Sequence, residues 1–331
     1  MYIKKSAKRL LATSLVIGTM ILTHIICNFY DIRFPLVEVF IARAEAKTYI
    51  DVEEEALYLQ KLKAADELRK SKKYIEAIKL YNEAIDIKQT DPVAYIGRGY
   101  SYYELENYKQ ALNDYNEVIQ LKPNFDVGYY LRGNAYHYLQ NYKQAIIDYS
   151  KAIQLNPNNI EAYFSRGFTY YTLENYNQAL TDYNKVIQFN PNNIVAYYYR
   201  GLVYYHFENY KQSMADYNKV VQLDPNDVRA YLGRGSIYFD LQNYEQAIVE
   251  FNKVVKLNPN FASVYFLRGI TYANLQNYRQ AIIDISKYIQ LVPNTPIAYN
   301  MRGNYYKDLG EEEKAQADFK KADELNGLGD N

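Results

Sequence analysis

Several residue types on which familiar classes of protein depend are scarce in this sequence of 331 residues. It has no tryptophan and only one cysteine, which excludes a disulfide framework and a cysteine-rich zinc or iron–sulfur site. Its 14 glycines and nine prolines are too few for a collagen-like or linker-like chain. Neither sign of charge is in excess, because 38 basic residues balance 38 acidic ones. A nucleic-acid binder needs a clustered basic surplus, so we expect no nucleic acid as a partner.

The chain is rich in tyrosine, with 40 of these residues, and 49% of its residues are hydrophobic. A disordered chain would combine low hydrophobicity with a large net charge, so this composition indicates a folded protein. Length alone would suggest two domains of ordinary size. An internal repeat overrides that expectation.

Three dipeptides recur along the chain with one constant period. Arg-Gly begins at Arg98, Arg132, Arg166, Arg200, Arg234, Arg268 and Arg302. Asn-Tyr begins at Asn107, Asn141, Asn175, Asn209, Asn243 and Asn277, and Pro-Asn begins at Pro123, Pro157, Pro191, Pro225, Pro259 and Pro293. Extending this frame predicts eight repeats, at residues 58–91, 92–125, 126–159, 160–193, 194–227, 228–261, 262–295 and 296–329.

Each repeat is expected to fold as two helices joined by a turn. In the repeat 126–159 the helical spacing i, i+4, i+7 is found first at Tyr129, Gly133 and Tyr136 and then at Ala145, Tyr149 and Ala152. We expect the small residues to let the helices approach and the tyrosines at 136 and 149 to fill the space around them. Asn141 tolerates the left-handed conformation that ends a helix and is expected to form the turn. Pro157 stops the second helix, and Asn159 can cap the next one.

The pattern Tyr-x2-Arg-Gly-x2-Tyr…Ala-x3-Tyr…Pro resembles the tetratricopeptide repeat over about 270 residues. Two departures recur, because tyrosine stands where the family has tryptophan and arginine where it has leucine. The first repeat is degenerate, with Ala64-Ala65 in place of Arg-Gly. The resemblance implies an all-α fold, a right-handed α-solenoid of about eight helix–turn–helix repeats. Here an N-terminal apolar helix is expected to precede it.

An arginine and an acidic residue recur together in the repeats. The arginine is at position 7, and position 23 is occupied by Asp114, Asp148, Asp182, Asp216, Glu250, Asp284 and Asp318. The two positions are equidistant from the turn, so they face each other across an antiparallel hairpin. We therefore predict an Arg–carboxylate pair inside each hairpin that has the arginine, bidentate where the geometry allows.

Residues 1–30 are basic and hydrophobic. They contain Lys4, Lys5, Lys8 and Arg9 and no acidic residue. The uncharged run from Leu10 to Tyr30 is long enough to span a bilayer, for which about 20 residues suffice. The basic residues predict a single-pass membrane protein with a cytoplasmic N-terminus and extracytoplasmic repeats. Residues 31–57 are expected to connect this segment to the repeats.

Two other interpretations of residues 1–30 remain open. A signal peptide could be cleaved at Ala42-Arg43-Ala44 or Ala44-Glu45-Ala46, which would leave a secreted or periplasmic protein. Both sites lie well beyond the apolar run, which slightly favours an uncleaved signal anchor. The segment could also be a buried amphipathic helix of a cytosolic protein, but a charge-free run of this length is typical of membrane segments.

The sequence contains no pattern that indicates chemistry. The three histidines, His24, His137 and His206, fall on different elements without the spacing of metal ligands. Cys27 has no plausible histidine partner outside the apolar run. We therefore expect no catalytic residue, no metal and no cofactor.

Positions 5, 9 and 12 of the first helix carry an aromatic stripe that differs between repeats. The resemblance places these positions on the concave face of the solenoid, where a peptide or protein could lie. The candidate residues for a partner-binding groove are Tyr130, His137, Phe164, Phe168, Tyr171, Tyr198, Tyr205, Phe239 and Phe266. The same rings could instead pack between neighbouring first helices, or reflect drift in composition.

The function predicted from the sequence is that of a non-enzymatic scaffold or assembly factor. It would be membrane-anchored or exported and would bind a protein or peptide in an aromatic groove. The alternative is a repeat protein that binds glycans in the cell envelope, because tyrosine faces and asparagine side chains can stack on sugars and hydrogen-bond to them.

Overall fold

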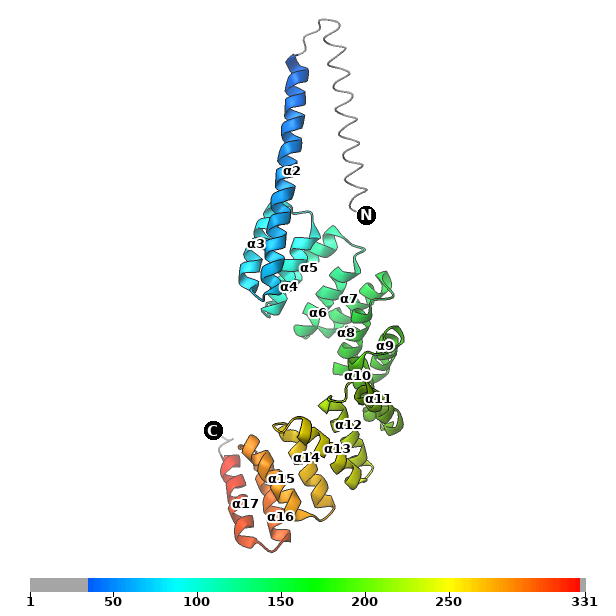
Figure 1. Ribbon diagram of the computed structural model, residues 1–331, viewed down its shortest axis with the longest axis vertical. Coiled ribbons are helices and arrows are strands. Elements are labelled where there is room, and N and C mark those ends of the chain that lie inside the picture. Colours follow the sequence, from blue (N-terminus) through cyan, green and yellow to red (C-terminus); the bar gives the residue numbers. More distant parts are fainter. Residues whose placement is uncertain (1–34, 328–331) are drawn as a thin grey trace. The chain divides into compact units, whose positions relative to one another are not determined.

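The computed structural model describes residues 35–327, so the predicted membrane segment at 10–30 lies outside the described residues. Within residues 35–327 there are sixteen helices in helix–turn–helix order and no strand (Figure 1). They are α2 (Pro35–Lys70), α3 (Tyr74–Ile87), α4 (Pro92–Glu104), α5 (Tyr108–Leu121), α6 (Asp126–Tyr138), α7 (Tyr142–Leu155), α8 (Ile160–Thr172), α9 (Tyr176–Phe189), α10 (Ile194–His206), α11 (Tyr210–Leu223), α12 (Val228–Asp240), α13 (Tyr244–Leu257), α14 (Ala262–Asn274), α15 (Tyr278–Leu291), α16 (Pro296–Asp308) and α17 (Glu312–Gly327). The all-α prediction is confirmed.

The chain divides into two compact parts, and the division falls within α4, between Ser101 and Tyr102. In the N-terminal part, α2 packs against α3, and Tyr81 is fully buried. The hydroxyl of Tyr81 donates to Asp66 Oδ1 at 2.6 Å. The helix α2 begins at Pro35, so residues 35–57 of the expected connector continue the first helix of the first repeat.

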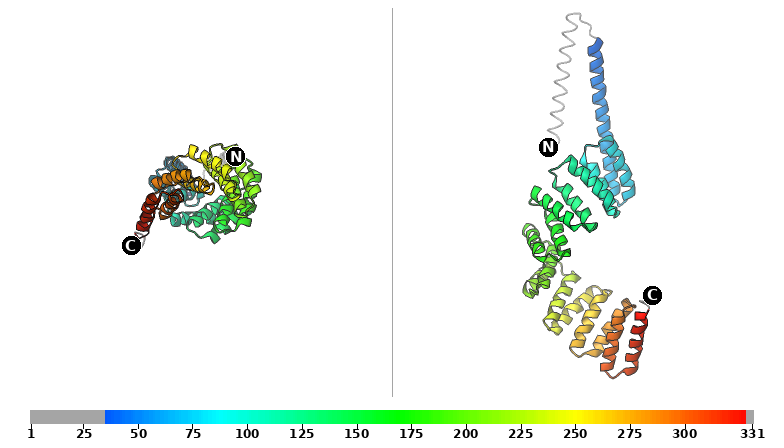
Figure 2. Two further views of the ribbon diagram at one scale, coloured as in Figure 1. Left: turned by 90° about the horizontal axis from the view of Figure 1, so that it is seen from below. Right: turned by 180° about the vertical axis from the view of Figure 1, so that it is seen from behind.

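The C-terminal part consists of helical hairpins in chain order. Within each hairpin from α6 to α17 the two helices pack against each other. From α5 onward, the second helix of each hairpin also packs against the first helix of the hairpin that follows. Figure 1 and the right view of Figure 2 show these hairpins side by side. The first helices also touch one another, α6 with α8, α8 with α10 and α10 with α12. A continuous face of first helices results, and it carries the aromatic stripe.

The core is built from a small residue facing a large one, as predicted. Gly133 lies directly against the ring of Tyr149, because a Cβ built on this glycine would approach Tyr149 to 2.7 Å. Tyr149 is buried together with Ala145 and Ala152 on the second helix. A glycine inside a helix costs about 1 kcal/mol relative to alanine. The close approach of the aromatic ring is the reason that a side chain at this position would not fit.

The face of the first helix that carries Tyr129, Gly133 and Tyr136 is only partly buried. Tyr129 and Tyr136 are only half-buried, and the buried residues of α6 are Gly128, Gly133 and Ala135. Tyr129 lies instead at the surface end of the helix, where its hydroxyl donates to the carbonyl of Pro123 at 3.1 Å. Tyrosine at position 4 is thus not mainly a core residue in this repeat.

The turn also differs from the prediction. The left-handed residue is not the asparagine but the residue before it, and Gln140 has a φ of 59°. The amide of Asn141 donates to the carbonyl of Tyr136 at 2.9 Å, which is the closing bond of a Schellman motif. Asn141 itself begins the next helix, since its side chain accepts a hydrogen bond from the amide of Gln144. Asparagine at this position is therefore an N-cap.

The predicted ends of the second helices are confirmed. The helix α7 ends at Leu155, two residues before Pro157. The side chain of Asn159 then accepts from the amide of Ala162 at 2.8 Å and caps α8. Asn193 caps α10 in the same way, and Asp227 caps α12 by accepting from the amide of Arg229. The Pro-Asn segments thus set the register in which each new first helix starts.

Candidate binding site

The arginine at position 7 holds together the helices that carry the candidate site. Arg166 donates from Nε and Nη2 to the two carboxylate oxygens of Asp182, at 2.8 and 2.7 Å, within its own hairpin. Its Nη1 donates to Ser150 Oγ of the preceding hairpin at 3.0 Å. The predicted pair is found at Arg132–Asp148, Arg166–Asp182, Arg200–Asp216, Arg234–Glu250, Arg268–Asp284 and Arg302–Asp318. The bond to the preceding hairpin was not predicted.

The two departures from the family pattern are explained by this arginine. In each of the six repeats just named, its guanidinium lies 5.4 to 5.7 Å from the ring centre of the tyrosine at position 4. Tyrosine and arginine therefore replace the family's tryptophan and leucine as a contacting pair, with a cation–π contact between them. The acidic residue at position 23 is the third member of this group, and it is buried. Burial raises the pKa of Asp182 above its usual range, and the guanidinium of Arg166 opposes that shift.

The predicted groove residues lie on first helices and are all half-buried. This holds for the nine candidates, which are Tyr130, His137, Phe164, Phe168, Tyr171, Tyr198, Tyr205, Phe239 and Phe266. They are thus in contact with neighbouring helices on one side and open to solvent on the other. The same side chains therefore both pack between neighbouring first helices and face solvent.

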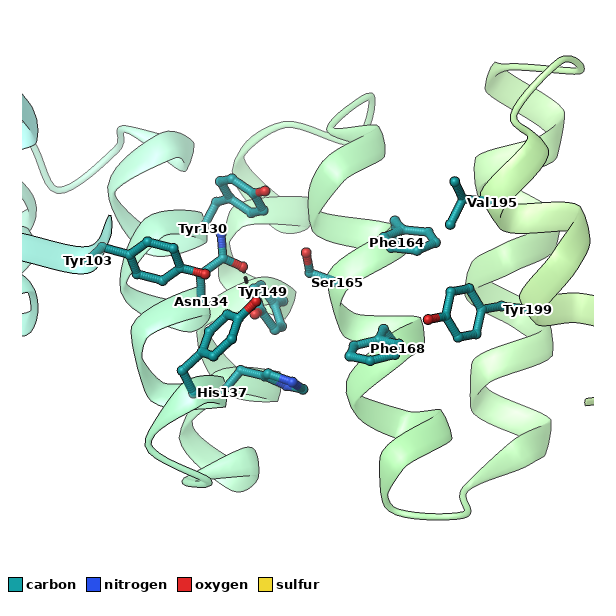
Figure 3. A pocket seen from close by; sticks show the side chains of 11 residues that line it. Tyr103, Tyr130, Asn134, His137, Tyr149, Phe164, Ser165, Phe168, Val195 and Tyr199 are labelled. Carbon is teal, nitrogen blue, oxygen red and sulfur yellow. Dashed lines mark hydrogen bonds between the residues drawn. The ribbon is translucent and has the colours of Figure 1, made fainter. Parts of the chain in front are cut away.

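Four of these residues, Tyr130, His137, Phe164 and Phe168, line one pocket of about 410 Å³ (Figure 3). The rest of the lining is Tyr103, Asn134, Tyr138, Tyr149, Ser165, Val195 and Tyr199. The pocket is formed by α6, α8 and α10, with further residues from α4 and α7. Seven of its eleven lining residues are tyrosine or phenylalanine, and none carries a formal charge at neutral pH when His137 is neutral.

The rings of the pocket are fixed by contacts with one another. Phe168 meets Tyr199 edge to face, with ring centres 5.2 Å apart, and Phe164 meets the same ring at 5.9 Å. On the other side the hydroxyl of Tyr149 donates to Asn134 Oδ1 at 2.8 Å, a bond that Figure 3 shows. Burial raises the pKa of Tyr149 and of Tyr103. Both phenols are therefore neutral, and the pocket presents ring faces rather than charge.

His137, on α6, contacts residues of α8 across the pocket. Its Nδ1 is 2.9 Å from Thr169 Oγ1, whose own proton is donated to the carbonyl of Ser165. Nδ1 must therefore be the donor, which leaves Nε2 as an acceptor in the neutral ring. Burial lowers the pKa of His137 and favours this neutral form. The ring also packs against Phe168, with centres 5.4 Å apart.

The remaining predicted residues are not in this pocket. Tyr198 and Tyr205 line a smaller one of about 110 Å³ together with Arg229, whose guanidinium lies 4.7 Å from the ring centre of Tyr198. Tyr205 also donates to Asp240 Oδ2 at 2.5 Å and so links two first helices. Tyr171, Phe239 and Phe266 pack in neighbouring clusters.

The pocket contains residues that the stripe did not predict. Tyr199 is at position 6, Val195 at position 2 and Tyr149 on a second helix. Positions 2, 6 and 9 are spaced by four and three residues and share a helix face, so this second stripe could have been found. Tyr149 was predicted as core, and the structure shows that its hydroxyl also reaches the pocket.

The part of the chain that the structure describes contains neither a metal site nor a membrane-spanning helix. No group of three or more His, Cys, Asp or Glu side chains there is arranged to hold a metal ion. No helix between residues 35 and 327 is both long and apolar enough to cross a membrane.

Family models match most of residues 65–327. One described as "TPR repeat" matches residues 65–106, 133–174 and 235–276. Two described as "Tetratricopeptide repeat" match residues 92–125, 160–193 and 194–227, and residues 262–295 and 297–327. No curated protein sequence matches the chain.

Solved structures share the fold. A tetratricopeptide repeat protein from Parabacteroides merdae is 26% identical, with a TM-score of 0.57, and the match covers 72% of this chain and 93% of that one. The C-terminal part of a TPR repeat-containing protein from Cytophaga hutchinsonii is 21% identical, with a TM-score of 0.60, and the match covers 72% of this chain and 97% of that one.

Proposed function

Since the chain belongs to the tetratricopeptide repeat family, we propose that it is a non-enzymatic scaffold or assembly factor that binds a protein or peptide on its face of first helices. The observation that carries this proposal is the aromatic pocket of about 410 Å³ between α6, α8 and α10. Its rings are fixed before any ligand arrives, so little side-chain entropy is lost on binding. Tyrosine and phenylalanine bury large areas and are typical anchors for a partner.

The first part of the proposal concerns Tyr130 and Phe164 as central contacts. They are better test positions than Tyr171 or Tyr205, because the hydroxyls of those two contact polar groups of the following repeat: Tyr205 donates to Asp240, and the hydroxyl of Tyr171 lies 3.5 Å from His206 Nε2. Substitution of those two would disturb the joint between repeats as well as the surface. Phe164 and Tyr130 line the pocket and leave the Arg–carboxylate pairs untouched.

The test is photo-cross-linking of the full chain in its native cells. A benzoylphenylalanine at position 164 is expected to form a discrete adduct with one partner, and Tyr130→Ala is expected to weaken that adduct. The matched control is the same probe at Ile147, which is 50% exposed on the second helix α7. Equal adducts from both positions, or none from position 164, would argue against the proposal. Mass spectrometry of the adduct distinguishes a protein partner from a glycan, the alternative ligand.

The second part of the proposal concerns location. We propose that residues 10–30 anchor the chain in a membrane, with the N-terminus cytoplasmic and the repeats on the other side. The support is the uncharged run from Leu10 to Tyr30, which four basic side chains precede. Fractionation combined with mass spectrometry of the mature N-terminus tests it. An intact N-terminus in the membrane fraction is expected, whereas a chain that begins after Ala44 or Ala46 would indicate a cleaved signal peptide.

A further inference from the structure

One contact in this chain shows what the aromatic pocket can hold. Tyr198 is at position 5 of its repeat, and Arg229 is at position 2 of the following repeat. The guanidinium of Arg229 lies 4.7 Å from the ring centre of Tyr198. Asp227 fixes that guanidinium with bonds of 3.0 Å to Nε and 2.6 Å to Nη2. The ring at position 5 and the residue at position 2 of the following repeat are thus neighbours across the joint between two first helices.

The same register identifies the corresponding residues at the large pocket. Phe164 is the ring at position 5 of the preceding repeat, and position 2 of the repeat that follows it is Val195. Both line the pocket. For Tyr130 the corresponding residue is Glu161, which is exposed. Arginine is therefore replaced by a short apolar residue at one ring and by an acid at the other. The space beside Tyr198 is about 110 Å³, whereas the space beside Tyr130 and Phe164 is about 410 Å³.

We propose that this pocket binds the guanidinium of an arginine side chain supplied by the protein partner, in the place relative to Phe164 that Arg229 takes relative to Tyr198. The inference rests on the proposed function and specifies the chemistry of the ligand. It concerns one side chain of the partner, not the whole binding face.

The chemistry of the lining favours a guanidinium over other groups. Ring faces carry negative potential and attract a cation, and a guanidinium sheds water more easily than an ammonium. A guanidinium has only donors, and the neutral His137 provides an acceptor at Nε2. No lysine or arginine lines the pocket, so no fixed cation opposes the incoming one. A carboxylate would face ring electrons without a basic partner.

The experiment compares two capped amino acids that differ in charge but hardly in shape. N-acetyl-arginine methylamide and its citrulline counterpart are titrated into the full chain while the aromatic resonances are followed by NMR. We expect shifts at Tyr130, Phe164 and Tyr199, with the arginine probe binding about fivefold more tightly, the ratio that a cation–π contact of about 1 kcal/mol provides.

Three variants complete the test. Val195→Arg places a guanidinium beside Phe164, as Arg229 lies beside Tyr198, and is expected to abolish binding of the arginine probe. Arg229→Val opens the smaller pocket and is expected to add a second set of shifts at Tyr198. Ile297→Arg is the matched control, because it makes the same change at position 2 of the last repeat, where the side chain is 59% exposed and outside the pocket. It is expected to leave probe binding unchanged.

The outcomes separate this inference from the proposed function. Equal affinity for arginine and citrulline, or full binding by V195R, overturns the arginine site. In that case a partner adduct at position 164 that V195R abolishes would still support the scaffold function. Conversely, arginine selectivity without any adduct at position 164 supports the site and argues against the scaffold. Helical circular dichroism and the melting temperature of each variant confirm that a loss of binding is not a loss of fold.

Discussion

At the scale of single residues, the tyrosines at position 24 differ in how their hydroxyls are satisfied. Tyr149 donates to Asn134, which is at position 9 of the same repeat. In the next repeat position 9 is Phe168, and among residues 35–327 the buried hydroxyl of Tyr183 has no hydrogen-bond partner. A buried polar group without a partner is destabilising. The two tyrosines therefore occupy equivalent positions, but the hydroxyl of Tyr149 stabilises the fold and the hydroxyl of Tyr183 destabilises it.

Substitution of these two tyrosines by phenylalanine tests this difference. Tyr183→Phe is expected to leave the free energy of unfolding unchanged or to raise it by up to about 1 kcal/mol, since it removes an unsatisfied hydroxyl. Tyr149→Phe is expected to lower it by about 1 kcal/mol, because Asn134 loses its donor. Urea unfolding followed by circular dichroism measures both. The same loss in both variants would show that the hydroxyl of Tyr183 is satisfied.

The half-buried His137 predicts a pH dependence of stability. Burial lowers its pKa in the folded protein, so below the ordinary value near 6.5 the unfolded chain takes up the proton first. The free energy of unfolding therefore falls as the pH drops from 6.5 to the folded pKa and then levels off. His137→Asn keeps a donor for Thr169 and is expected to remove this part of the acid sensitivity. The urea unfolding midpoints of the unsubstituted protein and of this variant are compared between about pH 7.5 and about pH 5. The same dependence on pH in both proteins would contradict the prediction.

At the scale of elements, the turn inside each hairpin contains one residue with a left-handed backbone, a conformation that glycine adopts more readily than other residues. Gln242 has a φ of 56°, and the corresponding residue of the last repeat is Gly310, with a φ of 77°. A left-handed conformation costs a residue other than glycine about 1 kcal/mol. The chain thus carries a small strain in each turn except the last.

Gln242→Gly is accordingly expected to raise the free energy of unfolding by about 1 kcal/mol. The neighbouring Asn243→Gly should instead lower it by about 0.3 kcal/mol, because Asn243 has a φ of −87° and its side chain caps α13 by accepting from the amide of Gln246. Thermal unfolding of the two variants compares them directly. If both were stabilised, the assignment of these two positions to the turn and the cap would be wrong.

The Arg–carboxylate pair within a hairpin is expected to be strongly coupled. Arg166→Met leaves the buried carboxylate of Asp182 without its partner, and we expect a loss of about 3 kcal/mol. Removing both charges in R166M/D182L should cost less than the sum of the single changes. The control is the exposed pair Lys321–Glu324, whose removal should change stability by about 0–1 kcal/mol. A double-mutant cycle that finds no coupling between Arg166 and Asp182 would refute the pairing energy, whatever its geometry.

The elements themselves were predictable from the sequence, and some of their details were not. The constant period of the dipeptides and the Pro-Asn segments located the hairpins, because both follow from local chain chemistry. Asn141 was assigned to the turn because asparagine tolerates a left-handed backbone, but it equally favours an N-cap. The spacing places Tyr129 on one face with Gly133, but it does not reveal that Tyr129 contacts Arg132. Propensity alone could not decide between these alternatives.

At the scale of the whole molecule, the candidate site was predictable only in outline. The stripe at positions 5, 9 and 12 located Tyr130, His137, Phe164 and Phe168 at the pocket. It missed Val195 and Tyr199, which lie on the stripe at positions 2, 6 and 9. The spacing could have identified that second stripe, but not that it meets the first stripe of the preceding repeat, because this contact depends on how the hairpins stack. That stacking is set by contacts such as the bond from Arg166 to Ser150, which one repeat in isolation does not reveal.

The bond of each arginine to the preceding hairpin gives the array a polarity. Between residues 102 and 327, each of six guanidiniums reaches back to an asparagine or serine of the hairpin before it. A chain shortened from the C-terminal end keeps every remaining guanidinium fully engaged. A chain shortened from the other end exposes one arm of its new first arginine. Loss of a C-terminal hairpin therefore leaves no guanidinium arm without its acceptor, whereas each loss of an N-terminal hairpin leaves one.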